Sequence, residues 1–167
     1  SYGKLGWGME FDGDDDYVDL GSGGSYEVTT PTISVWFNSR GGDDGDFVSS
    51  AADGGQNGYR LGIKAWDATE ISWLIGDSSS YTLVNTDGAE IDDNKWHHVV
   101  GTYDGITLKV YLDGILANTA PASRVITHSN NLHIGGRGGD PGDNIFNGSL
   151  DEVRIYSRAL SATEINQ

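Results

Sequence analysis

Hydrophobic and polar residues alternate along most of this chain, which is the period of a β-strand and not of a helix. In one such segment Ile33, Val35 and Phe37 fall on one face, and the residues between them are polar apart from Trp36. Two further segments alternate in the same way: residues 58–64 and 106–112. Each pattern predicts a strand with one buried face.

Shorter segments of the same character predict the remaining strands, at residues 7–11, 16–20, 46–51, 69–76, 80–85, 96–103, 115–119, 131–135 and 146–156. Asp104-Gly105 and Asp113-Gly114 flank the segment at 106–112, and Asp-Gly accepts the positive φ angles of a type I′ turn. About a dozen short strands without intervening helices indicate an all-β fold of two packed antiparallel sheets.

Only the last segment, "SRALSATEI" at residues 157–165, has a helical character. Ser161 is expected to cap its start, and Glu164, three residues later, would complete a capping box. No repeat or linker divides the chain, so a single domain is expected over residues 1–167.

The composition narrows the possible partners. The chain has 25 acidic and 10 basic residues, a net charge of −15, which disfavours nucleic acid and anionic membranes as partners. There is no cysteine and therefore no disulfide. No apolar run reaches the length of a membrane-spanning helix, and the first residues lack the basic-then-apolar pattern of a signal peptide.

Five motifs together give the chain a family likeness: "MEFDGDDDYVDL" at 9–20, "TISVWFN" at 32–38, "KWHHVVGTYDGITLKVYLDG" at 95–114, "LHIGG" at 132–136 and "FNGSLDEVRIYSRALSATEI" at 146–165. With them the chain resembles the laminin-G-like, concanavalin A-like jelly-roll domains of bacterial and archaeal extracellular proteins. The resemblance implies a two-sheet β-sandwich that is secreted or displayed at the cell surface, tethered to other domains of a larger protein. Such domains serve as carbohydrate binders, adhesion domains or spacers.

The resemblance also implies a structural calcium ion. A jelly roll of this type places its first and last strands side by side, which would bring Asp12 near Asp151. Asp15 or Asp16 would contribute a third carboxylate. Calcium takes six to eight oxygen ligands, and an acidic strand end can supply several of them. The alternative is that this loop is a polar turn and that Asp151 binds backbone amides.

A sugar site needs flat aromatic faces and polar groups for hydroxyls. The candidates for such a site are Trp36, Tyr59, Arg60, Trp66, Tyr81, Arg137, Asp140 and Asn144. Each of them could instead serve packing, and Trp7, Trp73 and Trp96 are expected in the core. Because the surface is acidic, neutral polysaccharides are favoured over anionic ones, unless Arg60, Lys64 and Arg137 form a local basic patch.

Glycoside hydrolases share this sandwich, so catalysis has to be considered. One related family carries Glu-x-Asp-x-x-Glu on a strand, and here Glu90 and Asp92 match the first half, but Lys95 replaces the second glutamate. The adjacent His97 and His98 would point to opposite faces of a strand and cannot share one metal. No catalytic residue is therefore predicted. The leading hypothesis is a non-catalytic carbohydrate-binding module; the alternatives are an adhesion or spacer domain and, third, a hydrolase.

Overall fold

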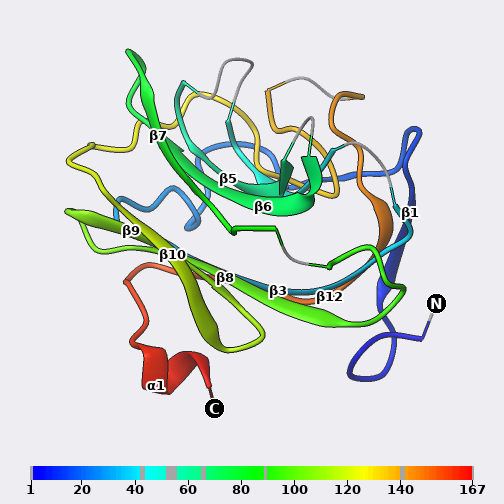
Figure 1. Cartoon of the computed structure of the whole chain (residues 1–167). Helices are drawn as coiled ribbons and strands as arrows, with labels where there is room; N and C mark the ends of the chain where they lie inside the picture. Colours follow the sequence, from blue (N-terminus) through cyan, green and yellow to red (C-terminus); the bar gives the residue numbers. More distant parts are fainter. Residues whose placement is uncertain are drawn as a thin grey trace.

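The computed structural model describes residues 2–41, 44–51, 56–64, 67–88, 90–139 and 142–166, which form two antiparallel sheets of six strands each (Figure 1). The first sheet has the order β1 (Met9–Asp12), β12 (Asn147–Tyr156), β3 (Thr32–Ser39), β8 (His97–Tyr103), β9 (Thr107–Leu112) and β10 (Ile115–Pro121). The second has the order β2 (Val18–Asp19), β11 (His133–Ile134), β4 (Gly45–Ser49), β5 (Tyr59–Lys64), β6 (Asp67–Gly76) and β7 (Tyr81–Asn85). The predicted all-β sandwich is confirmed.

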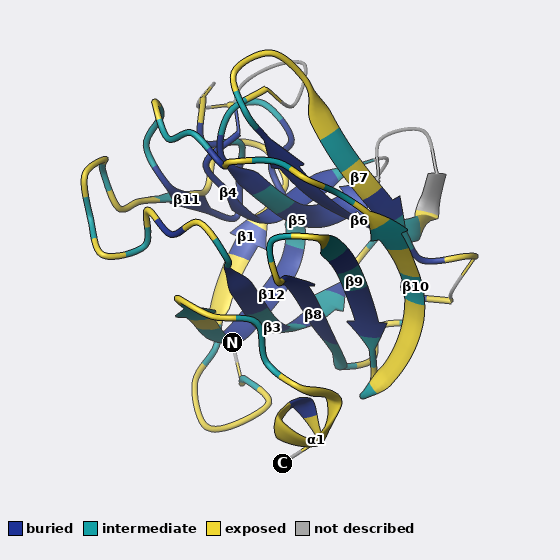
Figure 2. Cartoon of the chain, turned by 90° about the vertical axis from the view of Figure 1, so that its left-hand side faces the viewer, coloured by how far each residue is buried: buried dark blue, intermediate teal, exposed yellow. Residues whose placement is uncertain are grey.

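The core lies between the two sheets and is built from the alternating apolar residues of their inner faces (Figure 2). Phe37 of β3 stacks on Phe47 of β4, with ring centroids 4.6 Å apart. Trp73 of β6 is fully buried, and its indole N–H donates to the carbonyl of Thr102 at 3.0 Å. Gly101 leaves the space that this indole fills, since a Cβ there would lie 2.5 Å from a ring carbon of Trp73.

The meander of β8, β9 and β10 follows the predicted turns in part. Asp113 and Gly114 both have positive φ, 50° and 79°, as a type I′ turn requires. At the earlier turn only Gly105 has a positive φ, 98°. There the Asp104 carboxylate accepts hydrogen bonds from the two amides that follow the glycine, which closes the turn through a side chain.

The beginning and the end of the chain pair in the first sheet, as the resemblance implied, because β1 is hydrogen-bonded to β12. In this register Met9 is opposite Leu150 and Asp12 is opposite Asn147. The pairing of β12 with β3 then shifts between Asp151 and Arg154, and Glu152 at this bulge has a φ of 51°. The bulge turns Asp151 toward the loop that precedes β1.

The helix α1 (Ala162–Ile165) follows β12 and contains the predicted capping box of Ser161 and Glu164. Its residue Ile165 packs on Val100 and Tyr111 at the outer face of the first sheet. No helix in the described part of the chain has the length and apolar character needed to cross a membrane.

The loop before β1 corrects one expectation about the core. Trp7 is 78% exposed, because it pairs with Tyr2 across an isolated bridge and stacks on that ring with centroids 5.2 Å apart. Gly6 and Gly8 flank Trp7, so the alternation that predicted an inward face does not continue into this loop. Trp73 is in the core as expected, and Trp96 is only partly buried.

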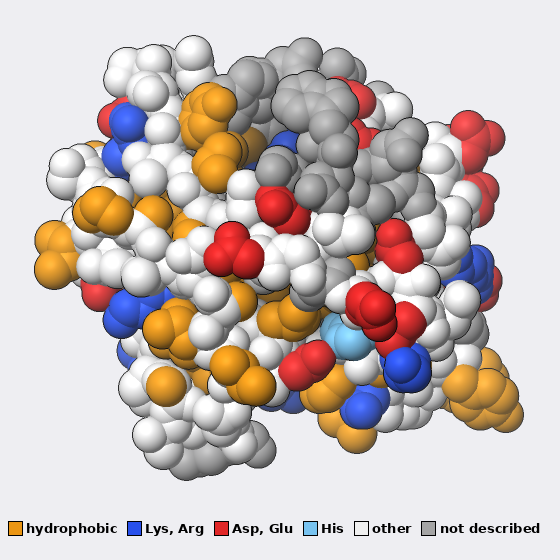
Figure 3. Space-filling view, viewed as in Figure 1, with side chains coloured by type: hydrophobic (Ala, Val, Ile, Leu, Met, Phe, Trp, Pro, Cys, Tyr) orange, Lys and Arg blue, Asp and Glu red, His pale blue; other side chains and the backbone are white. Residues whose placement is uncertain are grey.

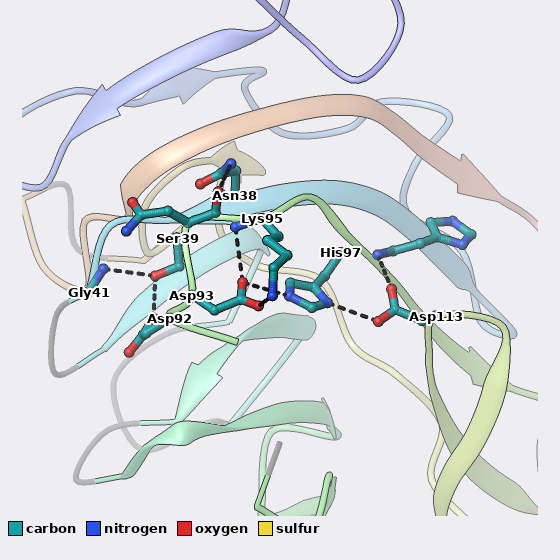
Figure 4. A network of polar contacts seen from close by, with 10 residues as sticks. Asn38, Ser39, Gly41, Asp92, Asp93, Lys95, His97 and Asp113 are labelled. Atoms are coloured by element: carbon teal, nitrogen blue, oxygen red, sulfur yellow. Dashed lines mark hydrogen bonds and ion pairs between the residues drawn. The ribbon is translucent and has the colours of Figure 1, made fainter. Parts of the chain in front are cut away.

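A polar network fixes the first sheet where β3 ends and β8 begins (Figure 4). The imidazole of His97 lies between two carboxylates, with Nδ1 2.8 Å from Asp113 and Nε2 3.2 Å from Asp93. The ring also contacts Phe37, with centroids 5.6 Å apart, whereas the ring of the next residue, His98, stacks on Trp36. The two histidines therefore point to opposite faces of the sheet.

Candidate functional site

Polar side chains form a row across the outer face of the second sheet, the face turned away from the first sheet. Asp19, His133, Ser49 and Arg60 stand directly opposite one another in the neighbouring strands β2, β11, β4 and β5. Arg60 lies between core residues on β5, so its side chain projects outward. Loops rise around this face in Figure 1, while the opposite face of the same sheet covers the core.

The centre of this face is a buried ion pair. The side chain of Asp46 is fully buried, and its Oδ1 lies 3.5 Å from Nε of Arg60, whose side chain keeps 14% of its surface exposed. Burial raises the pKa of the Asp46 carboxyl to about 6, although the charges of Arg60 and Arg137 act in the opposite direction. Asp46 therefore orients the guanidinium of Arg60 at the surface.

A second guanidinium is fixed beside this pair. Nη1 of Arg137 donates to Asp143 at 2.6 Å, and Nη2 donates to the amide oxygen of Asn144 at 2.7 Å. The carbonyl of Asn144 in turn accepts the backbone N–H of Asp46 at 2.9 Å, which joins the loop to β4. Each arginine thus has an acidic partner, so this face does not carry a free basic patch.

His133 links the loop to β11. Its Nδ1 lies 2.8 Å from the carbonyl of Arg137, and because a carbonyl only accepts, Nδ1 carries the hydrogen. Its Nε2 points toward Asp19, 3.5 Å away, and the ring of Tyr17 lies 4.8 Å from the imidazole. Tyr17 is 39% exposed and gives this face an aromatic ring.

We refer to six residues of this face as the Asp46 cluster: Asp46, Arg60, His133, Arg137, Asp143 and Asn144. In the described residues six buried side-chain atoms have no hydrogen-bond partner, and five of them belong to this cluster. They are both oxygens of Asp46, Nε of Arg60, Nε2 of His133 and Nδ2 of Asn144. Buried polar groups are nearly always satisfied, and the ion pair of Asp46 with Arg60 compensates part of this set, so the concentration marks a polar interior that ordered water or another polar group would complete.

The ligand residues predicted from the sequence are divided by the structure. Arg60, Arg137 and Asn144 come together in the Asp46 cluster. Tyr81 is on the edge strand β7 and is 43% exposed. Trp36 is on the outer face of the first sheet, on the opposite side of the molecule.

Of the three remaining candidates, the structure describes Tyr59 alone. Tyr59 is a correction: it is fully buried between the sheets, and its hydroxyl donates to the carbonyl of Tyr26 at 2.8 Å, so no external ligand contacts it. Its alternation with Leu61 already indicated this inward face. Trp66 and Asp140 lie outside the described residues.

Four members of the site were missed at the level of sequence: Asp46, Asp143, His133 and Tyr17. Asp46 precedes the buried Phe47, so alternation places it on the outer face. The sequence did contain a signal for this residue: Asp46 is the one charged residue in a strand whose other residues are apolar or small. The proximity of Asp143 and His133 to Arg137 depends on how the loop folds back, which no local pattern reports.

The expected metal ligands are also divided. Asp12 at the end of β1 and Asp15 and Asp16 in the loop that follows are exposed, with carboxylate oxygens within 4.8 Å of one another. Asp12 also accepts hydrogen bonds from the amides of Asp14 and Asp15, and these bonds lower the pKa of its carboxyl. Three carboxylates are the hard donors that calcium prefers, so the donor set fits this ion.

Asp151 does not join these carboxylates, which corrects the expectation that both ends of the chain converge on one ion. The β1–β12 register puts Asp12 opposite Asn147, and Asp151 lies four residues further along β12, roughly 13 Å at 3.3 Å per residue. The Asp151 carboxylate is buried and accepts two backbone N–H groups, from Leu5 and from Glu152, both at 2.8 Å.

The segment that was compared with a hydrolase motif is part of a loop between β7 and β8. Its Asp92 carboxylate accepts the hydroxyl hydrogen of Ser39 and so holds the end of β3 (Figure 4). Acidic side chains are dispersed over the face seen in Figure 3 and are not gathered into one patch there.

Comparison with known proteins places the chain among lectin-like folds. The family model of the concanavalin A-like lectin/glucanases superfamily matches residues 12–166. Adhesion G-protein coupled receptor V1 of Danio rerio is 26% identical over 144 residues, which cover 81% of this chain and 2% of the receptor. The chain thus spans only a small part of that relative.

Solved structures agree in fold. The CBM40 of the Ruminococcus gnavus IT-sialidase, bound to α2,3-sialyllactose, has a TM-score of 0.77 at 17% identity, covering 95% of this chain and 94% of that chain. Domain 4 of AbnA, a GH43 extracellular arabinanase from Geobacillus stearothermophilus in complex with arabinotriose, has a TM-score of 0.72 at 20% identity, covering 99% and 78%. At such identities the likeness concerns the fold.

Proposed function

Since the chain belongs to the concanavalin A-like lectin/glucanases superfamily, we propose that it is a non-catalytic carbohydrate-binding module that holds a neutral glycan at the Asp46 cluster. The module acts outside the cell or at its surface, as one domain of a larger protein. The sialidase CBM40 and the arabinanase domain, which share its fold, were solved with sialyllactose and arabinotriose, and this supports a glycan as the ligand.

The observation that carries the proposal is a partly exposed guanidinium: the buried Asp46 pairs with Arg60, whose side chain keeps 14% of its surface exposed. The N–H groups of Arg60 are donors for sugar hydroxyls, and Asp46 acts only through Arg60. A sugar hydroxyl both donates and accepts, so one polyol can accept from Arg60 and donate to the carboxylate of Asp143, whose side chain is 46% exposed. The partly exposed ring of Tyr17 supplies the flat surface against which the apolar face of a sugar ring packs.

The charges favour a neutral glycan over an anionic one. Asp46 opposes Arg60 and Asp143 opposes Arg137, so the cluster has no excess of positive charge. A net charge of −15 adds a repulsive field for polyanions. The arginines then act as hydrogen-bond donors to hydroxyls.

We also propose a calcium ion at Asp12, Asp15 and Asp16. The ion would neutralise three carboxylates that otherwise repel one another in one loop. This loop also borders a polar cleft that Asp44 and Asn144 line, so an ordered loop would support one side of the Asp46 cluster.

Affinity electrophoresis in gels containing arabinan, galactan, xylan or a mixed-linkage β-glucan tests the proposal. Retarded migration in at least one neutral polysaccharide is expected, and Arg60→Met should weaken the retardation. Lys109→Ala changes the same charge on the other sheet and serves as the control. Normal migration in every gel, or equal retardation of Arg60→Met and wild type, would contradict the proposal.

The alternative is an adhesion domain, which the partial likeness to an adhesion receptor favours. Such a domain would bind a protein surface and leave the Asp46 cluster without a sugar. Retardation by a neutral polysaccharide that weakens in Arg60→Met separates the two functions, because a domain that binds only protein is not retarded by polysaccharide.

A further inference from the structure

A groove of about 570 Å³ crosses the outer face of the first sheet, on the opposite side of the sandwich from the Asp46 cluster. Its floor comes from β12, β3 and β8. The loop before β1 borders it at Leu5, the segment before α1 at Leu160, and α1 itself at Ile165. We call it the Trp36 groove. In Figure 1 α1 lies below the first sheet, and loops lie above the second sheet.

The floor of the Trp36 groove is a pair of stacked rings. Trp36 and His98 are directly opposite in β3 and β8, with centroids 4.9 Å apart and planes inclined by 21°. Nε2 of His98 lies 2.8 Å from the hydroxyl of Ser34, which holds the imidazole in place. Burial lowers the pKa of His98, so the ring is neutral at pH 7 and extends the indole as an uncharged platform.

Charged groups stand around this platform without covering it. Arg154 is opposite Ser34 in the register and forms an ion pair with Glu152. On the other side Asp113 accepts the backbone N–H of His98 at 2.9 Å and also holds His97, as Figure 4 shows. Donors and acceptors therefore lie on both sides of an aromatic surface, which is the composition of a sugar-binding groove and not of an apolar docking face.

The indole already holds a ligand-like group from the chain itself. The ammonium of Lys4 lies 4.4 Å from the centroid of the Trp36 ring. Lys4 is exposed, and a cation–π contact at an exposed site contributes only about 0.5–1 kcal/mol. A sugar ring buries more of the indole than an ammonium does, so it can displace Lys4 at this small cost.

We propose that the Trp36 groove is a second carbohydrate site that takes one or two rings of a neutral pyranoside. The apolar face of the ring packs on Trp36 in place of the Lys4 ammonium, and its hydroxyls pair with Arg154 and Asp113. The volume lies in the range of small-ligand sites. Because the two sites face away from each other, one module can bridge two polysaccharide chains.

The direct test is titration of the ¹⁵N-labelled protein with cellobiose, lactose and methyl β-D-galactopyranoside, followed at the indole N–H signals. A shift of the Trp36 indole signal is expected with at least one sugar, and it should persist in Arg60→Met, which alters only the other face. Trp36→Ala should abolish this binding. Lys4→Ala should tighten it roughly two- to fivefold, because the competing ammonium is gone.

Three results would overturn the proposal: no shift of the Trp36 signal with any of the sugars, loss of that shift in Arg60→Met, or binding unaffected by Trp36→Ala. Should Trp36→Ala fail to fold, the Lys4→Ala comparison still decides, since unchanged or weaker binding contradicts displacement of the ammonium. Retardation by polysaccharide that depends on Arg60 would remain in each of these cases, so failure of the second site is distinguishable from failure of the proposed function.

Bridging of two polysaccharide chains by one module can be measured separately, by light scattering. Wild-type protein mixed with a polysaccharide that retards it should increase light scattering near equivalence and less in excess protein. Trp36→Ala and Arg60→Met should each remain able to bind through one site but should not raise the scattering. Scattering that persists in Trp36→Ala would show that bridging does not use the groove.

Discussion

Nε of Arg60 lies 3.5 Å from a carboxylate oxygen of Asp46, and this pairing leaves the acid fully buried and the base partly exposed. The ion pair offsets only part of the desolvation cost of the buried Asp46 carboxylate. This is seen in its pKa, which is raised to about 6. The acid thus imposes a free-energy cost on the fold while it orients a guanidinium on the surface.

This cost should be visible as a pH dependence. Between the unfolded pKa near 3.8 and the folded pKa near 6, the folded state binds more protons, so stability falls as pH rises through this window and is level above it. In Asp46→Asn this fall in the free energy of unfolding, on the order of 1–3 kcal/mol between the two pKa values, should be absent. Urea unfolding at pH 4 and pH 7 measures it, with Asp14→Asn as the exposed control. Equal slopes for wild type and Asp46→Asn would contradict the assigned burial.

His97 should also make stability fall as pH rises, but in a higher pH window than Asp46. Partial burial lowers its pKa, but the hydrogen bonds and charges of Asp113 and Asp93 outweigh this and raise it overall. The stability that it contributes is complete below the unfolded pKa near 6.5 and is lost as pH rises through the folded value. His97→Gln should therefore lower the Tm more at pH 5.5 than at pH 9. Each kcal/mol of unfolding free energy that is lost corresponds to a decrease in Tm of roughly 2–4 °C. A Tm difference that is independent of pH would contradict the pairing of His97 with Asp93 and Asp113.

Chelation tests the carboxylates of the acidic loop. Calcium at a hundredfold excess over its Kd should stabilise the fold by about 2.7 kcal/mol, and EDTA should reverse the gain. The double variant Asp15→Asn, Asp16→Asn should lose this response. Asp151→Asn is the matched control: it leaves one acceptor oxygen for the two amides of Leu5 and Glu152 and so lowers the Tm, but it keeps the response to calcium. A melting curve that is the same in calcium and in EDTA would exclude the ion.

The contact between Gly101 and Trp73 predicts a packing defect. Gly101→Ala places a methyl group where the indole ring lies, and overpacking of this kind costs about 1–3 kcal/mol. In Gly101→Ala, Trp73→Phe the smaller ring makes room, so the two changes should cost less together than the sum of their separate effects. Denaturant unfolding of the four proteins of this cycle measures the coupling, and strict additivity would show that the two side chains do not compete for space.

Most of the fold follows from local patterns in the sequence. The alternation at residues 32–38 and 146–156 gives β3 and β12 to within a residue, and Asp113-Gly114 forms the expected tight turn. The capping box of Ser161 and Glu164 also follows from spacing alone. These features depend on residues close together in the chain, so the sequence is sufficient to predict them.

The site was less predictable because it depends on register and on loops. Pairing of the first and last strands was expected, but the separation of Asp12 from Asp151 is set by the offset of β1 against β12, which no local pattern encodes. Trp36 and Arg60 were grouped as one binding set, although they project from different sheets. Trp7 was expected inside because alternation was extended into a loop that turns at Gly6.

The antiparallel contact of β1 with β12 has a mechanical consequence. Met9 and Leu150 form the last pair at one end of the β1–β12 ladder. The loop before β1, which is bound to Asp151 through the Leu5 amide, lies at this same end. Tension between the two ends of the sandwich would open this ladder one rung at a time, as in unzipping, and would not load all rungs in parallel shear. The amides bound by Asp151 would be the first to yield, so the seam would give way at low force and could re-form once the tension is released.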